Sequence, residues 1–177
     1  MTWWFWGLVV VVAVFFYLNQ TAGRLDRLHI RVDQARAALD EQLIRRSAVV
    51  SELSTSGLLD PASSLLLAEA AHEARAAAPD QRVRAQSDLT EALQVAFDDP
   101  VSVELLQAQP GGAELVTELA AVSRRVQLAR GFLDDAVRSC ERVRRLRFVR
   151  WLRLAGRAPW PRTETFADAP PLALVTA

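Results

Sequence analysis

The sequence predicts an all-α protein in which a single N-terminal transmembrane helix precedes an antiparallel four-helix bundle with long first and last helices. Three observations predict this class. The first eighteen residues are almost entirely apolar, apolar residues recur at helical spacing through most of the remainder, and strand-like alternation never runs for more than a few residues. We expect an anchor at 1–18, a helical bundle at 19–156 and an extended, proline-containing tail at 157–177.

The N-terminal segment Trp3–Leu18 contains no charged residue. Together with the two residues before it, the segment approaches the length of about 20 apolar residues that a membrane-crossing helix needs. A cleaved signal peptide is the alternative, but no basic side chain precedes the apolar run and Asn19-Gln20-Thr21 is a poor cleavage site. We therefore expect an uncleaved anchor. The aromatic residues expected at its two membrane interfaces are Trp3, Trp4, Trp6 and Tyr17.

Positive charge follows the anchor but does not precede it. Arg24 and Arg27 come directly after the apolar run, and Arg31 and Arg36 follow, whereas only the α-amino group lies on the other side. The positive-inside rule then predicts a single-pass protein of the cell membrane, with the N-terminus outside and the helical domain in the cytoplasm.

The first bundle helix is expected from Asn19 to about Leu53. Its apolar stripe is formed by Leu25, Leu28, Val32, Ala35 and Leu39, and it continues after a slip with Leu43, Val50 and Leu53. We assign Arg45 and Arg46 to the solvated face, where Asp40 and Glu41 offer charge partners one turn away.

Two shorter helices are predicted next. Asp60 followed by Pro61 is typical of a helix start, with Asp as the N-cap and Pro at the first helical position. The second helix is expected at 61–78 and the third at roughly 80–97. Asp98-Asp99-Pro100 is interpreted as a helix stop, followed by a looser connection at 100–112 with at most one helical turn around Val103–Leu106.

The fourth helix has the most regular pattern in the chain. Its heptad-spaced residues are Leu115, Leu119, Val122, Val126, Ala129, Leu133, Ala136, Cys140 and Val143. This seam fits either an intramolecular bundle or a homo-oligomeric coiled coil. Because three other amphipathic helices are available to cover it, we favour the bundle.

A net charge of zero conceals two regions of opposite sign. Asp60–Glu118 holds three arginines against eleven acidic residues, a balance of −8, whereas the chain from Ala121 onward holds twelve against five, a balance of +7. The basic charge is densest in Arg138–Arg162, with nine arginines and one acid. In an up-and-down bundle the last helix returns to the membrane, so we expect a basic base on anionic headgroups and acidic second and third helices that meet a protein partner.

The stretch RLRFVRWLRLAG, Arg145–Gly156, predicts a short amphipathic helix. Arg147, Arg150 and Arg153 share one face, and Phe148 and Trp151 lie on the opposite one. This apolar stripe is rotated by roughly 90° from the seam of the fourth helix. A membrane-interface role is the first interpretation, covering the base of the bundle is the second, and nucleic-acid binding is the third.

No set of residues in the sequence predicts catalysis, a metal site or a cofactor. His29 and His72 lie far apart, and His72-Glu73 lacks the second histidine of the H-E-x-x-H zinc motif. Cys140 lies on the heptad seam, where we expect a buried and unreactive thiol. Gly111-Gly112 lacks the Lys-Ser/Thr of a phosphate loop. We therefore expect a protein that is not an enzyme and has no cofactor or small-molecule substrate.

Three stretches of the chain resemble the LemA family. LDEQLIRRSAVVSEL (Leu39–Leu53) is similar to its Q-L-x-R-R helix, ARGFLDDAV (Ala129–Val137) to its A-R-x-F-Y-N-x-A-V signature, and the Gly156–Phe166 stretch to its carboxyl end, where an aromatic residue lies near an acidic one. Leu133-Asp134 replaces the Tyr-Asn pair, and the proline after the two arginines is missing. The resemblance implies a four-helix bundle tethered to the cytoplasmic membrane, without an assigned reaction.

The function expected from these patterns is that of a non-enzymatic, membrane-tethered helical scaffold or envelope-associated adaptor. Its partners would be the lipid bilayer, through anionic headgroups, and an unidentified protein. The alternative is membrane-tethered nucleic-acid binding through the Arg-rich C-terminal segment, which would fall steeply with salt.

Overall fold

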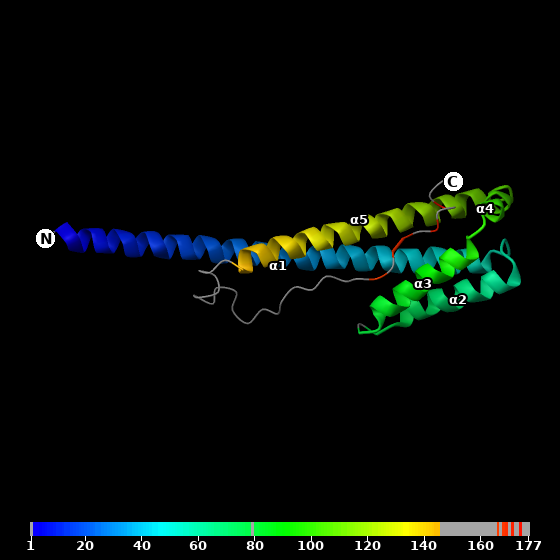
Figure 1. The fold of residues 1–177 in the computed structure, drawn as a ribbon, viewed down its shortest axis with the longest axis horizontal. Coiled ribbons are helices and arrows are strands. Elements are labelled where there is room, and N and C mark those ends of the chain that lie inside the picture. The colour runs from blue at the N-terminus through cyan, green and yellow to red at the C-terminus, as the bar shows by residue number, and fades with distance from the viewer. Residues whose placement is uncertain are drawn as a thin grey trace. The chain divides into compact units, whose positions relative to one another are not determined.

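The computed structural model describes residues 2–78, 80–145, 166, 168, 169, 171 and 174. Within them every regular element is an α-helix, which confirms the predicted all-α class (Figure 1). The helices are α1 (Thr2–Thr55), α2 (Pro61–Ala76), α3 (Arg82–Ala96), α4 (Pro100–Gln107) and α5 (Gly112–Arg144).

The helices contribute to two compact units. The first unit contains α1 up to Arg36 and α5 from Phe132. The second contains residues 37–131 together with the described residues between Phe166 and Leu174. The long helices α1 and α5 therefore each contribute to both units, whereas α2, α3 and α4 belong to the second unit alone.

Helix α1 runs from Thr2 to Thr55 without interruption. The predicted start of a separate helix at Asn19 is therefore wrong. No proline lies in this stretch, and a single interior glycine such as Gly23 costs only about 1 kcal/mol relative to alanine, which is too little to break a long helix. The helix ends at a serine-rich turn where Gly57 adopts a positive φ of 76°.

Helix α2 begins as the sequence predicts. Oδ1 of Asp60 accepts hydrogen bonds from the backbone N–H groups of Ala62 at 2.9 Å and Ser63 at 3.1 Å, and Pro61 occupies the first helical position. The helix ends at Ala76, two residues before the predicted end. Helix α3 begins at Arg82 rather than near 80, after Gln81, whose side chain makes no capping hydrogen bond.

Helix α4 corrects the prediction of a loose connection at 100–112. Oδ1 of Asp99 accepts a hydrogen bond from the backbone N–H of Val101 at 3.1 Å, and Pro100 occupies the first turn. Asp99-Pro100 therefore starts a helix in the same way as Asp60-Pro61. Val103 and Leu106 on this helix are buried, so α4 contributes to the core.

The core of the second unit is formed by all five helices. Helices α2 and α3 pack against each other side by side and run in opposite directions (Figure 1). The core residues are Val49, Val50 and Leu53 on α1; Leu67, Ala70, Ala71 and Ala74 on α2; Leu89, Ala92 and Leu93 on α3; Phe97; Val103 and Leu106 on α4; Val116, Leu119 and Val122 on α5; and Leu174. The predicted four-helix bundle thus carries a fifth helix.

The predicted seam of α5 is buried at seven of its nine positions, and Leu115 and Val143 at its two ends are half-buried. In the first unit the buried α5 residues include Leu133 and Ala136, and those of α1 are Leu25 and Val32. The heptad pattern therefore identified the inward face of α5 through both units.

Arg46 does not lie on a solvated face, so that prediction is wrong. Its side chain is only 2% exposed and is hydrogen-bonded to α3. Arg45 is exposed, but it pairs with Glu118 on α5 at 3.1 Å rather than with an acid on its own helix. Asp40 pairs with Arg82 on α3 at 3.1 Å. The charges of this part of α1 therefore bind to other helices.

Candidate interaction surfaces

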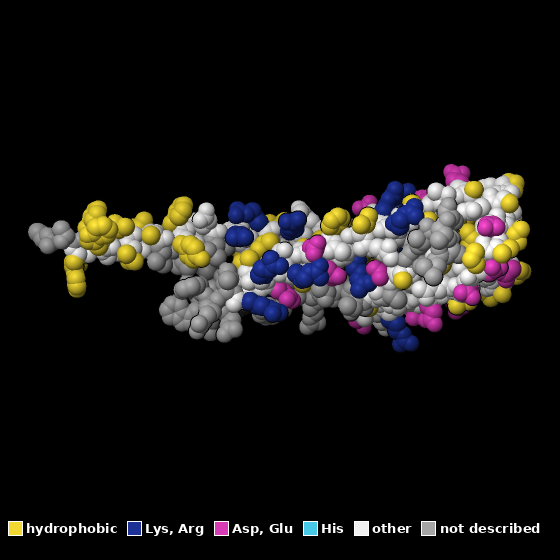
Figure 2. Space-filling view, turned by 45° about the horizontal axis from the view of Figure 1, so that its top comes forward, with side chains coloured by type: hydrophobic (Ala, Val, Ile, Leu, Met, Phe, Trp, Pro, Cys, Tyr) yellow, Lys and Arg dark blue, Asp and Glu magenta, His cyan; other side chains and the backbone are white. Residues whose placement is uncertain are grey.

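The N-terminal part of α1 exposes many apolar side chains (Figure 2). Of the predicted interface residues, Trp3 and Trp4 are 82% and 83% exposed, and Trp6 and Tyr17 are also exposed. Val14 and Leu18, within the same run, have side chains outside the described ones. Among the side chains that are described, no helix offers a stretch both long and apolar enough to cross a membrane.

The predicted basic base is described only in part. Arg24 and Arg27 on α1 are exposed, as expected. The remaining predicted interface residues lie outside the described residues: Arg147, Phe148, Arg150, Trp151 and Arg153. At the described end of α5, Arg138 pairs with Asp135 at 2.6 Å and Arg145 with Glu141 at 3.2 Å. These two cations therefore carry acidic partners on their own helix.

An open groove of about 470 Å³ lies between α2 and α3. The residues that line it are Leu66, Glu69, Ala70 and Glu73 on α2 and Asp88, Glu91, Ala92 and Val95 on α3. Each helix thus contributes two carboxylates. Ala70 and Ala92 are buried, whereas Leu66 and Val95 are 40% and 65% exposed. The groove therefore combines acidic side chains with an apolar surface.

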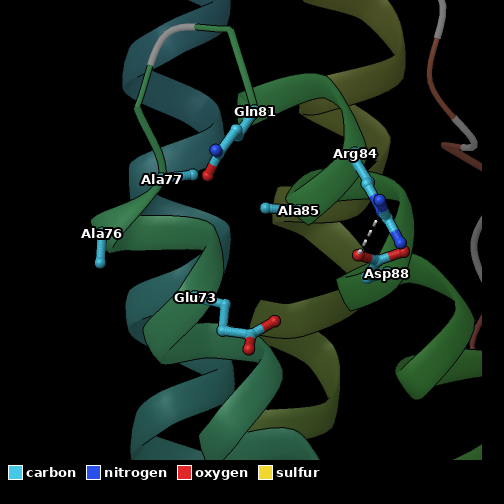
Figure 3. Close-up of a pocket in the computed structure, with 7 residues that line it drawn as sticks. All are labelled: Glu73, Ala76, Ala77, Gln81, Arg84, Ala85 and Asp88. Atoms are coloured by element: carbon cyan, nitrogen blue, oxygen red, sulfur yellow. Dashed lines mark ion pairs between the residues drawn. The ribbon is translucent and has the colours of Figure 1, made fainter.

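A second hollow, of about 520 Å³, shares Glu73 and Asp88 with this groove. Figure 3 shows Glu73 on α2 across from an ion pair on α3, between Nε of Arg84 and Oδ2 of Asp88 at 3.9 Å. Ala77 and Gln81 line the hollow at the connection between the two helices. Only one arginine thus accompanies the four carboxylates of the two hollows, and we call both hollows together the acidic groove.

The acidic groove has the chemistry of a surface that receives a basic amphipathic helix. Such a helix buries its apolar face in a groove while its cations reach carboxylates at the sides. Among the described residues, no three His, Cys, Asp or Glu side chains lie so that they could hold a metal ion together. The sequence predicted the acidity of this region but not the groove, because the shared face of α2 and α3 depends on how the two helices pair.

The described residues between Phe166 and Leu174 belong to the second unit, and sequence reasoning missed the contacts that hold them there. Nη1 of Arg130 lies 2.7 Å from Oδ1 of Asp168 and donates to the backbone oxygen of Phe166 at 2.8 Å. The guanidinium also lies over the ring of Phe166, 5.2 Å from its centroid. Leu174 is buried in the core. The described residues of the predicted tail are therefore bound to the bundle, and the LemA-like stretches that contain Arg130 and Phe166 were the available signal.

Cys140 and the two histidines lie on three different parts of the helices, in different surroundings. Cys140 is buried, as predicted, and burial raises the pKa of its thiol, an effect that the nearby charge of Arg144 partly offsets. Nε2 of His29 lies 3.4 Å from Nη1 of Arg144, and His72 is exposed on α2. The candidate sites of this chain are therefore its apolar N-terminal surface, its acidic groove and its bound C-terminal segment. No known protein family, curated protein or solved structure matches the chain.

Proposed function

We propose that the protein is a non-enzymatic helical scaffold or adaptor that is tethered to a membrane by the first part of α1. The observation that carries this proposal is the exposure of the described apolar side chains between Trp3 and Tyr17, which belong to the same uninterrupted helix as the core residues Val49, Val50 and Leu53. An exposed apolar surface of this extent is uncommon on soluble monomers and is typical of a surface that lipid or another protein covers.

The length of the apolar run determines how it would lie in lipid. Sixteen helical residues, Trp3–Leu18, rise about 24 Å, against a hydrocarbon core of about 30 Å. A short helix is accommodated by local thinning of the bilayer and by interfacial side chains at its ends. With Arg24 and Arg27 on the inner side, the proposed orientation has the N-terminus outside and the bundle in the cytoplasm.

Charge placed inside the run tests the membrane attachment. In cells that express the full chain, we expect the wild type in the membrane fraction after a carbonate wash. Val10→Arg/Val11→Arg should move to the soluble fraction, because each arginine at the centre of a membrane helix costs about 3 kcal/mol. Ile44→Arg, at an exposed apolar position outside the run, should stay with the membrane. A wild type in the soluble fraction, or a double variant retained on membranes, would refute the proposal.

Labelling from outside distinguishes a crossing helix from one that lies in the interface. A Thr2→Cys/Cys140→Ser chain carries its only thiol next to the apolar run. If the run crosses the membrane in the proposed orientation, a membrane-impermeant maleimide labels intact cells. Labelling only after lysis would mean that both ends of the run lie on the inner side.

The partner proposed for the acidic groove is a basic amphipathic helix of another protein. A labelled peptide with alternating arginine and apolar faces, such as RLRFVRWLRLAG, is a suitable probe of this chemistry. Its binding to the full chain in nanodiscs, measured above its binding to empty nanodiscs of the same lipid, should fall with salt and should be lost in Glu69→Lys/Glu91→Lys. The matched control, Glu104→Lys/Glu114→Lys, makes the same charge change outside the groove and should bind as the wild type does. Equal loss in both variants would mean that the peptide responds only to net charge.

The LemA-like assignment and the nucleic-acid alternative remain predictions. A LemA-like protein would also be a membrane-tethered bundle, so the resemblance supports the same proposal. Nucleic-acid binding relies on Arg138–Arg162, in whose described part Arg138 and Arg145 pair with acids. Salt-sensitive binding of duplex DNA by a chain that does not bind anionic vesicles would favour the alternative.

A further inference from the structure

We call residues 164–177 the C-terminal segment. Side chains of α3 and α5 donate hydrogen bonds to backbone oxygens of its described residues. Nε2 of Gln94 on α3 donates to the carbonyl oxygen of Ala169 at 3.1 Å. On α5, Nε2 of Gln127 donates to the carbonyl oxygen of Asp168 at 3.2 Å, and Nη1 of Arg130 donates to that of Phe166. We call Gln94, Gln127 and Arg130 the donor row. These three donors bind carbonyl oxygens of the backbone at Phe166, Asp168 and Ala169, so the contacts do not depend on the side chains of the segment.

Three side chains of the segment add sequence specificity to these backbone contacts. The ring of Phe166 is buried under the guanidinium of Arg130. The carboxylate of Asp168 forms the ion pair with the same guanidinium. Leu174 is 1% exposed and belongs to the core cluster of the second unit. The pattern that fits the donor row is therefore an aromatic residue, a carboxylate two residues later and a leucine six residues after that.

A second arginine, Arg46, also interacts electrostatically with the carboxylate of Asp168. Arg46 is buried, its hydrogen bonds go to the neutral groups of Gln86 and Thr90, and its Nε has no partner within the described part of the chain. Asp168 is the carboxylate whose charge acts on this guanidinium. The carboxylate of Asp168 thus pairs directly with Arg130 and acts on Arg46 only through its charge.

We propose that the donor row is a binding site for an extended peptide with this pattern, and that the chain's own C-terminal segment occupies it as an exchangeable ligand. A partner protein that presents the same pattern, Phe-x-Asp followed by Leu, would bind there by displacing the segment. This interaction surface is separate from the acidic groove, whose proposed ligand is basic and helical. The two sites therefore select partners of opposite charge.

Cleavage of the folded full chain tests the proposal. A specific protease site introduced at 157–163 separates the segment from the bundle, and a fluorescent synthetic peptide of residues 164–177 then reports binding by anisotropy. We expect the peptide to exchange into the cleaved protein. Peptides with Phe166→Ala or Asp168→Asn should bind about tenfold or more weakly, because each loses a contact to a charged guanidinium. A scrambled peptide of the same composition should not bind.

Variants of the bundle provide the matched comparison. Arg130→Ala should weaken binding of the wild-type peptide, whereas Arg125→Ala, which removes an exposed arginine of the same helix, should not. The proposal is overturned if the scrambled peptide binds equally well, if the Asp168→Asn peptide binds as tightly as the wild type, or if no peptide binds a cleaved protein that retains its helical circular dichroism.

If cleavage unfolds the bundle, the proposal is tested on the uncleaved chain by hydrogen exchange. Excess wild-type peptide should speed hydrogen exchange at the backbone amides of residues 166–174, because it displaces the chain's own segment, and the scrambled peptide should not. Unchanged exchange at saturating peptide would show a fixed structural tail and overturn the proposal.

Discussion

Arg46, in the C-terminal part of α1, donates from Nη2 to Oε1 of Gln86 on α3 at 2.7 Å, although both residues are only 2% exposed. The same nitrogen also donates to the backbone oxygen of Gln86 at 3.1 Å, and Nη1 donates to Oγ1 of Thr90 at 3.2 Å. Burial lowers the pKa of Arg46 to about 10, and the charge of Asp168 partly offsets this shift. A charged side chain thus lies among neutral hydrogen-bond acceptors in the core.

Replacing the acceptor Gln86 by leucine should lower the free energy of unfolding more than replacing the charged Arg46 by methionine, a side chain of similar length. Gln86→Leu leaves a buried guanidinium without its shortest hydrogen bond, and hydrogen bonds to charged groups contribute about 1.5–3 kcal/mol. Arg46→Met removes the charge and fills most of the space, so the groups that it leaves without a partner are the neutral oxygens of Gln86 and Thr90. An unpaired neutral group in the core costs less than an unpaired charge. Urea unfolding of the two variants checks this order. A larger loss in Arg46→Met than in Gln86→Leu would contradict it.

The position of Arg46 also explains the slip in the predicted stripe of α1. Leu39, Leu43, Val50 and Leu53 are all buried, and Arg46 supplies the missing position, so that the spacing 4-3-4-3 is unbroken. A hydrophobicity pattern treats arginine as solvated, because its burial requires partners that another helix supplies. Gln86 lies 40 residues away, and its proximity could not be derived from periodicity.

Two glycines should respond oppositely to substitution by alanine. A Cβ on Gly112, at the start of α5, would lie 1.8 Å from the backbone oxygen of Leu106, whereas a Cβ on Gly131 would meet nothing within 4 Å. We expect Gly112→Ala to lower the free energy of unfolding by more than about 1 kcal/mol, because the clash is with backbone. Gly131→Ala should raise it by up to about 1 kcal/mol through helix propensity. Urea unfolding measures both, and a stabilised Gly112→Ala would contradict the backbone geometry.

The cap of α2 should make stability depend on acid pH. Hydrogen bonds from Ser63 and the backbone lower the pKa of Asp60 below its ordinary 3.8. The unfolded chain then binds more protons at acid pH, so the stabilisation is complete above about pH 4 and is lost as the pH falls through the folded pKa. Asp60→Asn keeps the cap and should lose this part of the pH dependence, whereas Asp60→Ala should be less stable at neutral pH. Thermal unfolding between pH 2 and pH 7 compares them. An Asn variant with the wild-type acid profile would exclude Asp60 as the source.

The two Asp-Pro pairs show what local signals can and cannot predict. Asp60-Pro61 and Asp99-Pro100 both begin helices with the Asp side chain as a cap. The second pair was interpreted as a stop because the third helix was expected to run to about residue 97, directly before it. In the structure α3 ends at Ala96 and α4 begins at Pro100, so the pair lies between the end of one helix and the start of the next.

The candidate surfaces likewise differ in how far they could be predicted from the sequence. The apolar run at the N-terminus and the acidity of α2 and α3 are properties of contiguous sequence and were predicted. The acidic groove was not predicted, because it depends on how α2 and α3 pack. That packing brings Glu69 and Glu73 of α2 to the same groove as Asp88 and Glu91 of α3. The binding of Asp168 by Arg130 joins residues 38 positions apart, beyond any helical period.

The buried thiol of Cys140 should be protected from reagents until the protein opens. The side chain has no exposed surface, and burial raises the pKa of the thiol, so the reactive thiolate is disfavoured in the folded state. At pH 8 we expect slow reaction of the native protein with Ellman's reagent and fast reaction in concentrated urea. Arg138→Cys/Cys140→Ser moves the only thiol to a side chain that is 61% exposed, and this variant should react quickly without denaturant. Native protein that reacts as fast as the control variant would contradict the burial of Cys140 on the α5 seam.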